Sequence, residues 1–297
     1  MRVHVFPVFG SSHLGAIRRE QVKEFLAGKA SGKLARNSVR LILSAMRVIF
    51  NAGIEDGVID RNPAARLGKL TKTEKPAHKA ESMTREDAEK FLAASLEVCP
   101  DYHPLFLTAL RAGLRKGELL ALQWGDINFG ATADDPRYIL VQRNWSHGQF
   151  ITPKNGKPRR VDLSKELRAV LLALREARLL AAFQIGKESI ADELVFPSQA
   201  GTVIKPDNIA RRYMEPALTA AGLRRFRFHD LRHTFGSLLI QAGASLVYVR
   251  DQMGHSSIQI TVDCYGHLVP GADIANVDRL DAVKKPATKR NPRATWN

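Results

Sequence analysis

Cysteine is scarce in this chain of 297 residues, which contains only Cys99 and Cys264. The two lie far apart and lack the paired spacing of zinc ligands. The sequence therefore predicts neither a disulfide framework nor a structural metal site. We expect both side chains to be reduced thiols.

Long hydrophobic runs are absent as well. No apolar stretch approaches the roughly 20 residues of a membrane-spanning helix, and no signal-peptide pattern opens the chain. The sequence predicts a cytoplasmic protein with no membrane partner.

Acidic side chains are few relative to basic ones. Lys and Arg number 45 against 30 Asp and Glu, which gives a formal net charge of +15. This imbalance indicates a polyanionic partner, of which nucleic acid is the leading candidate and an acidic membrane surface the alternative. The chain is 44% hydrophobic and long enough to build two domains with cores of their own.

The hydrophobic periodicity divides the chain at one place. Apolar residues fall at helical spacing over 17–26 and 37–54, which predicts a small helical unit over 1–70. The next segment, 71–81, reads TKTEKPAHKAE and is interpreted as a basic linker, because it has no large apolar residue. Such a linker suits a protein that closes around a rod of negative charge, but solubility alone explains it equally well.

The second body, 82–272, has a mainly α pattern with a small antiparallel β-sheet, an α+β fold. Thr84, with Asp87 three residues later, is typical of a helix N-cap. Asn155-Gly156 is a favoured tight-turn pair and places Lys154 on a hairpin. We predict helices over 84–98, 103–124 with a break at 112–113, 165–183, 207–221 and 229–243, and strands over 138–145, 150–154 and 159–163.

Dispersed motifs carry the chemistry of this second body. In the last third, His229 is followed three residues later by Arg232, and Tyr265 comes ten residues after His255, which follows a glycine. Upstream, the segment TALRAGLRKGELLALQWGDIN contains Arg115 and, three residues later, Glu118. The hairpin segment TPKNGKPRRVDL contains Lys154.

In order and spacing these motifs resemble the tyrosine recombinase (phage integrase) family over residues 84–268. The helical unit 1–70 resembles the family's core-type DNA-binding domain, and 82–272 its catalytic domain. The resemblance implies a site-specific recombinase that cleaves and rejoins double-stranded DNA through a 3′-phosphotyrosine intermediate. Integration or excision of a phage or mobile element is the role that we expect.

The residue types suit that reaction. Arg115 and Arg232 offer planar forks of donors to a phosphodiester whose charge grows during in-line attack. The Tyr265 hydroxyl is a poor nucleophile at its ordinary pKa of about 10, and His229 is its candidate base. Lys154, on a mobile turn, is the candidate acid for the departing 5′ oxygen.

Three further residues complete the predicted site. His255 would add a donor to the scissile phosphate, and Glu118 would orient a basic or imidazole partner. His233 lies four residues after His229, but the glutamate that a zincin has beside its first histidine is missing here. We interpret His233 as a packing residue or a support that could hydrogen-bond near the site, and its role stays open. No metal or cofactor is expected, because arginine and lysine supply the positive charge.

Alternative interpretations remain for single residues. Lys157, Arg159 and Arg160 share the predicted hairpin with Lys154 and could contact phosphate or reach the active site; motif position favours Lys154. Tyr265 alone could be a core aromatic, and only the joint pattern argues against this.

The carboxyl end, 273–297, is predicted to be a short helix with a basic tail. Ile274, Val277, Leu280 and Val283 form one apolar stripe, which could pack on its own domain or dock on a neighbouring subunit. The resemblance implies the second arrangement, in a homotetramer bound to DNA. Without DNA the protein could be a monomer. DNA-bending or directionality proteins would be accessory partners.

Many phage integrases also carry an amino-terminal domain for arm-type DNA sites. This chain starts at what resembles the core-binding unit, so we expect either a shorter recombinase or a truncated form.

Two other functions share part of the pattern. A type IB topoisomerase uses the same chemistry but relaxes supercoils without a partner site. A non-catalytic DNA-binding regulator has no need of the whole catalytic set, which consists of Arg115, Lys154, His229, Arg232, His255 and Tyr265. Chain length and the two-domain layout favour the recombinase over the topoisomerase. The intact set of residues argues against the regulator.

Overall fold

The computed structural model describes residues 1–32, 34–67, 81–132, 134–153, 156–269, 274 and 277–278. The chain divides into two compact units, Met1–Pro76 and Ala77–Asn297, and each is described by itself. Nearly all of the predicted linker, the basic tail and most of the predicted terminal helix lie outside the described residues. Within the described ranges, no helix is long and apolar enough to cross a bilayer.

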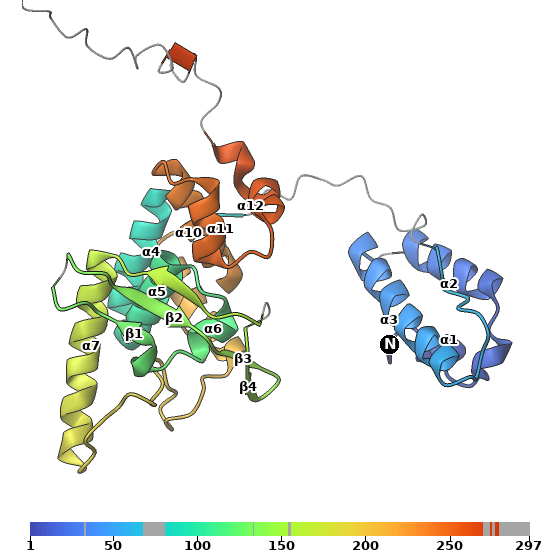
Figure 1. Ribbon diagram of the computed structural model, residues 1–297, viewed down its shortest axis with the longest axis horizontal. Helices are drawn as coiled ribbons and strands as arrows, with labels where there is room; N and C mark the ends of the chain where they lie inside the picture. Colours follow the sequence, from blue (N-terminus) through green and yellow to red (C-terminus); the bar gives the residue numbers. More distant parts are fainter. Residues whose placement is uncertain are drawn as a thin grey trace, which may run out of the picture. The chain divides into compact units, whose positions relative to one another are not determined.

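The amino-terminal unit is a small helical body (Figure 1). Its two long helices, α2 (Arg19–Ser31) and α3 (Arg36–Glu55), lie where the periodicity predicts them, after the short helix α1 (Phe6–Phe9) and a 3-10 turn at Leu14–Ala16. The apolar stripes of α2 and α3 face each other. Their buried side chains and those around them form the core of this unit: Val5, Val22, Leu26, Val39, Ile42, Leu43, Met46, Phe50, Ala64 and Leu67.

Three helices open the second unit: α4 (Arg85–Val98), α5 (His103–Ala112) and α6 (Lys116–Leu120). The predicted cap of α4 is confirmed, because Thr84 Oγ1 accepts a hydrogen bond from Asp87 N at 3.0 Å and Asp87 Oδ2 accepts one from Thr84 N at 3.2 Å. The predicted break between the next two helices is confirmed as well. It forms the turn on which the first arginine motif lies.

The sheet differs from the prediction. The predicted strand 138–145 is wrong, because β2 (Tyr138–Val141) ends early and β3 (Asn144–Ser146) begins a separate hairpin with β4 (Gln149–Ile151). β2 pairs antiparallel with β5 (Arg159–Asp162) on one side. On its other side lies β1 (Ile127–Asn128), which the periodicity did not predict.

A buried carboxylate explains the break after β2. Asp126 is 3% exposed, and its Oδ1 accepts hydrogen bonds from Gln142 Nε2 at 2.7 Å and from Arg143 Nη2 at 2.6 Å. These contacts turn the two residues away from the ladder. The tight turn that joins β3 to β4 is His147-Gly148, and both residues have positive φ. Lys154 and Asn155 of the predicted turn lie outside the described residues. The hairpin predicted around them is wrong, because β4 pairs with β3 and β5 pairs with β2, so the flanking strands do not pair with each other.

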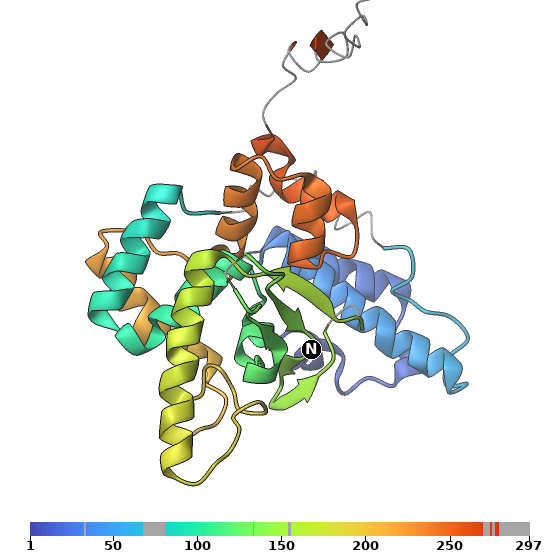
Figure 2. The same cartoon turned by 60° about the vertical axis from the view of Figure 1, so that its left-hand side comes forward.

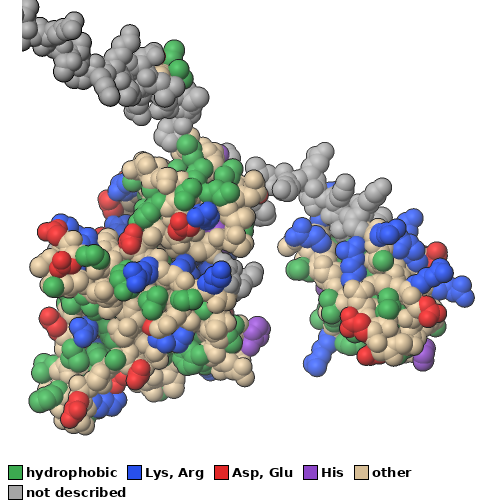
Figure 3. Space-filling view, in the orientation of Figure 1, with side chains coloured by type: hydrophobic (Ala, Val, Ile, Leu, Met, Phe, Trp, Pro, Cys, Tyr) green, Lys and Arg blue, Asp and Glu red, His purple; other side chains and the backbone are tan. Residues whose placement is uncertain are grey.

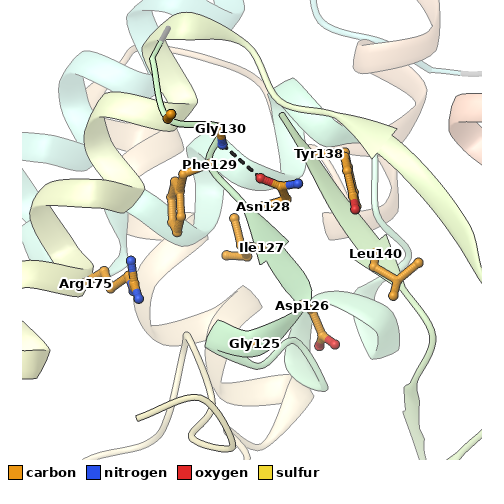
Figure 4. A pocket seen from close by; sticks show the side chains of 10 residues that line it. Gly125, Asp126, Ile127, Asn128, Phe129, Gly130, Tyr138, Leu140 and Arg175 are labelled. Atoms are coloured by element: carbon orange, nitrogen blue, oxygen red, sulfur yellow. Dashed lines mark hydrogen bonds between the residues drawn. The ribbon is translucent and has the colours of Figure 1, made fainter. Parts of the chain in front are cut away.

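A cavity of about 490 Å³ lies beside β1 and β2 (Figure 4). Ile127, Tyr138 and Arg175 are among its lining residues. At the end of β1, Asn128 Oδ1 accepts a hydrogen bond from Gly130 N at 2.9 Å, which closes the turn drawn in Figure 4. None of the predicted site residues lines this cavity, so it belongs to the scaffold.

The middle of the unit is helical, as predicted. The long helix α7 (Lys165–Gln184) runs along one side of the unit in Figure 1. The predicted helix over 207–221 consists of three continuous pieces: α8 (Pro206–Asn208), a π-helical stretch (Ile209–Met214) and α9 (Glu215–Ala220).

Three helices close the described part of the unit: α10 (Phe228–Gln241), α11 (Leu246–Met253) and α12 (Ile258–Tyr265). Figures 1 and 2 both place them together at one end of the unit. Gln252 Oε1 on α11 accepts a hydrogen bond from Asp162 N on β5 at 2.8 Å, which joins this helical end to the sheet. The motifs of the last third therefore come close to the hairpin motif.

Candidate active site

Arg115 stands at the amino-terminal cap of α6. Its backbone N–H donates to Glu118 Oε2 at 2.8 Å, and its Nη1 donates to Glu118 Oε1 at 2.8 Å. Its Nη2 donates to the carbonyl oxygen of Gly254 at 2.9 Å. The side chain remains 27% exposed. Arg115 is thus held on one side and open to solvent on the other.

Arg232 comes from α10 and is only 3% exposed. Its Nη1 donates to the carbonyl oxygen of Gly113 and its Nη2 to that of Met253. Burial, and after it the charge of Arg115, lowers the pKa of Arg232 from its ordinary value. Arg115 binds the carbonyl of Gly254, and Arg232 binds the carbonyl of Met253, the residue before it. The two guanidiniums therefore meet at the end of α11.

His229 and His233 lie one helical turn apart on α10. Their ring centroids are 4.8 Å apart and the rings are nearly perpendicular, at 88°. Partial desolvation by its neighbours, followed by the charge of Arg232, lowers the pKa of His229, while much of the side chain stays accessible at the surface. Burial also lowers the pKa of His233 to about 4. His233 is therefore neutral at pH 7, and one of its ring nitrogens can accept a hydrogen bond.

Tyr265 is the last residue of α12 and is completely buried. Its hydroxyl lies 2.8 Å from His233 Nδ1. The ring packs closely against α10, where a Cβ on Gly236 would lie 2.8 Å from Tyr265 Cζ. Burial raises the pKa of Tyr265 above its ordinary value. The phenol is therefore protonated and enclosed in this arrangement.

The histidine that contacts the phenol is not the one that the sequence analysis named as its base. The structure places His233, and not His229, at hydrogen-bond distance from Tyr265. Sequence reasoning left the role of His233 open, between packing and a supporting hydrogen bond near the site. The available signal was its position one turn beyond His229, but choosing between the two requires knowing which side of α10 faces α12.

His255 follows Gly254 directly after α11. Its Nδ1 lies 2.9 Å from the hydroxyl of the buried Thr261, which fixes the ring. The ring is nearly parallel to that of Tyr265, with centroids 6.4 Å apart. Burial, followed by the charges of Arg232 and Arg115, lowers the pKa of His255 to about 4.

Lys154 lies outside the described residues, and its predicted role stays a prediction. The following part of its motif is described, and Lys157 and Arg160 are exposed there. Arg159 instead reaches Glu118, with Nη1 at 2.9 Å from Oε1 and Nη2 at 2.7 Å from Oε2. A cavity of about 580 Å³ is lined by Arg115, Arg159 and His255, among other residues.

Glu118 is the buried centre of these contacts, with a side chain that is 1% exposed. Burial alone would raise its pKa. The hydrogen bonds and charge of Arg159, followed by the contacts of Arg115, outweigh this effect and lower the pKa to about 2. Glu118 contacts Arg115, and its predicted role of orienting a basic or imidazole partner stays a prediction. The second partner, Arg159, was not predicted.

The arrangement can bind and activate a phosphodiester. Two guanidiniums and several imidazoles converge from segments far apart in the sequence, beside one phenol: Arg115, Arg232, His229, His233, His255 and Tyr265. Preorganised cationic donors of this kind stabilise the charge that grows on a phosphate under attack. The phenol of Tyr265 is the candidate nucleophile, although it is buried.

Comparison with known sequences identifies the same region. Residues 81–270 match the phage integrase family. The ICEBs1 integrase of Bacillus subtilis is 28% identical over 281 residues, which cover 94% of this chain and 74% of that protein. A XerC-like tyrosine recombinase of Caldanaerobacter subterraneus is 26% identical over 284 residues, which cover 89% of this chain and 70% of that protein.

Comparison with solved structures shows the same fold. The Tn1549 transposon integrase in complex with transposon right end DNA has a TM-score of 0.67 at 19% identity, over 90% of this chain and 87% of that one. The XerH site-specific recombinase bound to its difH substrate has a TM-score of 0.65 at 19% identity, over 90% and 72% of the two chains. Since the family match covers well over half of the sequence, the chain belongs to the phage integrase family of tyrosine-type site-specific recombinases.

Proposed function

We propose that this recombinase cleaves DNA with Tyr265 as the nucleophile and with Arg115, Arg232 and His255 as the groups that bind the scissile phosphate. The observation that carries the proposal is the meeting of Arg115 and Arg232 at two successive carbonyls beside His255. Two guanidinium forks and an imidazole supply donors to the non-bridging oxygens, where charge grows during attack.

The proposed step is a transesterification. The Tyr265 oxygen forms a bond to phosphorus while the bond from phosphorus to the 5′ oxygen breaks, which leaves the DNA 3′ end on the tyrosine. The phenolic proton passes to an imidazole of the pair His229 and His233, and Lys154 protonates the leaving 5′ oxygen. A 5′ hydroxyl of another duplex then reverses the step. No external energy source is needed, because the phosphotyrosine linkage retains the energy of the broken bond.

Attack also requires a change in the position of Tyr265. Its side chain is completely buried and its hydroxyl is held by His233, so no DNA phosphate can reach it in this arrangement. We infer that the end of α12 shifts when DNA binds. The arrangement described here is then the resting state of the nucleophile.

Basic side chains around the site support DNA as the partner. A cavity of about 860 Å³ is lined by Lys116, Arg225, Arg227 and His229, among others. The amino-terminal unit exposes Arg36 and Arg40 one helical turn apart on α3. Figure 3 shows Lys and Arg side chains over the visible face of this unit. We assign it the core-type DNA-binding role, with phosphate contacts as its main source of affinity.

The names of the relatives favour a mobile element. They include the ICEBs1 integrase, the Tn1549 transposon integrase and a putative prophage integrase of Mycobacterium tuberculosis that is 28% identical over 273 residues. We therefore propose integration or excision of such an element as the role of this protein.

Exchange between subunits is the assembly that we propose. Val247, Ile258, Ile260 and Val262 on α11 and α12 are between 38% and 52% exposed. Figure 3 shows hydrophobic side chains at the end of the unit that carries these helices. Large apolar side chains at one surface are typical of an interaction site. The carboxyl-terminal segment of a neighbour, with DNA-bending or directionality proteins as further partners, would complete a tetramer on DNA.

A nicked suicide substrate that contains the core site tests the proposed nucleophile. Cleavage releases a short fragment, so the covalent adduct accumulates. We expect a denaturation-resistant adduct of the wild type in the presence of EDTA, and none with Tyr265→Phe. The matched control is Tyr138→Phe, which removes the hydroxyl of a partly buried tyrosine on β2 outside the proposed site and should leave adduct formation unchanged.

The same preparation separates the other functions. A wild type that binds DNA but forms no adduct would contradict the proposal and favour a regulator. Relaxation of supercoiled DNA without a partner site, at the rate of strand exchange or faster, would favour a topoisomerase. Two-site exchange with an adduct on Tyr265 is the expected result.

A further inference from the structure

The contacts of Glu118 with two arginines call for a functional explanation. Each carboxylate oxygen accepts one hydrogen bond from Arg159 and one from Arg115, at distances between 2.7 and 2.9 Å. The Glu118 side chain is 1% exposed and that of Arg159 is 13% exposed. A buried carboxylate with four charge-assisted or backbone donors is fixed in place.

Charge balance gives the second arginine a role. If Glu118 faced Arg115 alone, the pair would be neutral, and the carboxylate would compete with a DNA phosphate for the same guanidinium. With Arg159 the group of three carries one net positive charge. The contacts with Arg159 and Arg115 lower the pKa of Glu118 to about 2, so the carboxylate is charged and this balance holds at neutral pH. Arg159 thereby offsets the charge of Glu118, so that the positive charge of Arg115 remains available to a phosphate.

Arg159 also reaches the turn that carries His255. Its Nε donates to the carbonyl oxygen of Gln252 at 3.2 Å. Its side chain passes so close to Gly254 that a Cβ there would lie 2.7 Å from Arg159 Cδ. Arg115 binds the carbonyl of the same glycine. One side chain on β5 therefore fixes both the first arginine and the turn that precedes His255.

We propose that Arg159 is a positioning residue of strand cleavage: it neutralises Glu118 and holds Arg115 and His255 in register, without contacting DNA itself. Both of its Nη atoms are bound to the single carboxylate of Glu118, whereas Arg115 gives that carboxylate only one Nη and keeps 27% of its side chain exposed. This inference rests on the proposed function, because it assigns a part to Arg159 in the same phosphate site.

Single-turnover cleavage of the suicide substrate at saturating protein tests the role. We expect Arg159→Gln to lower the cleavage rate constant about 100-fold, because a displacement of about 1 Å in a catalytic group has an effect of this size. The Kd for DNA should change only a few-fold. Arg159→Lys keeps the charge but not the planar fork, and should fall between the wild type and Arg159→Gln.

The matched control is Arg111→Gln. Arg111 also binds a glutamate, Glu166, at 2.9 Å and is 26% exposed, but it lies outside the site. Its loss should leave the cleavage rate constant within about two-fold of the wild type. Urea unfolding of all variants shows whether a slow variant is folded. If Arg159→Gln does not fold, Arg159→Lys takes its place as the test.

A double-mutant cycle with Glu118→Gln separates positioning from general support of the structure. If Arg159 acts by neutralising Glu118, removal of the carboxylate charge removes the need for it. The double variant should then cleave no slower than Arg159→Gln alone. Rate losses that multiply would overturn the proposal, and so would a wild-type rate constant in Arg159→Gln or a loss confined to DNA affinity. Absence of an adduct with the wild type would instead contradict the proposed function itself.

Discussion

At the scale of the residue, the contact between His233 and Tyr265 links stability to pH. Only the neutral imidazole can accept a hydrogen bond from the phenol. Burial lowers the pKa of His233 to about 4, whereas an unfolded histidine titrates near 6.5. Between these values the unfolded chain binds a proton at this residue that the folded chain does not. The contribution of neutral His233 to the free energy of unfolding is therefore complete above about pH 6.5 and is lost as the pH falls toward 4.

Replacement of His233 by Phe should reveal this contribution. At pH 7.5 we expect the free energy of unfolding to fall by about 1–3 kcal/mol, because the buried Tyr265 hydroxyl loses its acceptor. The difference from the wild type should shrink at pH 4.5, where the wild type has lost its own contribution. Urea unfolding at the two values measures both. His147→Asn, on the exposed turn after β3, controls for loss of an imidazole, and a gap that stays constant with pH would refute the link.

At the scale of the element, the helices could be predicted and the pairing of the strands could not. The stripe on α3, the Thr84 cap and the break before α6 are local signals, and each lies where the sequence places it. β2 ends early because Asp126, distant from it in the sequence, binds Gln142 and Arg143. Strand alternation carries no signal for such a contact.

The candidate site divides in the same way. The family motifs predicted Arg115, Arg232, His255 and Tyr265, and the structure brings them to one end of the unit. The partner of the phenol and the second partner of Glu118 depend on which faces of α10, α12 and β5 meet. These choices arise from packing, so composition and spacing do not determine them.

The packing of α12 on α10 makes a prediction of its own. Gly236→Ala would place a methyl group 2.8 Å from both Tyr265 Cζ and Met253 Sδ. We expect the free energy of unfolding of this unit to fall by about 1–3 kcal/mol from overpacking. The α12 end should also loosen, which alkylation of Cys264 under native conditions would detect as a faster reaction.

Gly28→Ala is the matched control for that change. Gly28 also lies within a helix, α2, but nothing lies within 4 Å of a Cβ built there. Alanine should leave stability unchanged or raise it by up to about 1 kcal/mol, because it has the higher helix propensity. Equal destabilisation by both substitutions would mean that the contact with Tyr265 is not the cause.

At the scale of the whole molecule, the net charge of +15 favours DNA as the partner, and the number of phosphates contacted sets how binding responds to salt. A protein that neutralises DNA phosphates releases counterions, so the logarithm of its affinity falls linearly with the logarithm of salt concentration. The slope is about −0.9 for each phosphate contacted. Substituting basic residues in one of the two structural units changes the slope by the number of phosphate contacts that this unit loses. The contacts of each unit can therefore be counted separately.

The role proposed for the amino-terminal unit can be tested in this way. Arg36 and Arg40 are exposed one turn apart on α3, and the double variant to Gln should reduce the magnitude of the slope by about 2 if each meets a phosphate. The control is Lys90→Gln on α4, where Lys90 already pairs with Glu86 at 2.8 Å. Its slope should match that of the wild type. Fluorescence anisotropy with a core-site duplex at five salt concentrations gives all three slopes. If the double variant keeps the wild-type slope, this face of α3 does not lie on the DNA backbone, and the contacts of this unit must come from another of its surfaces.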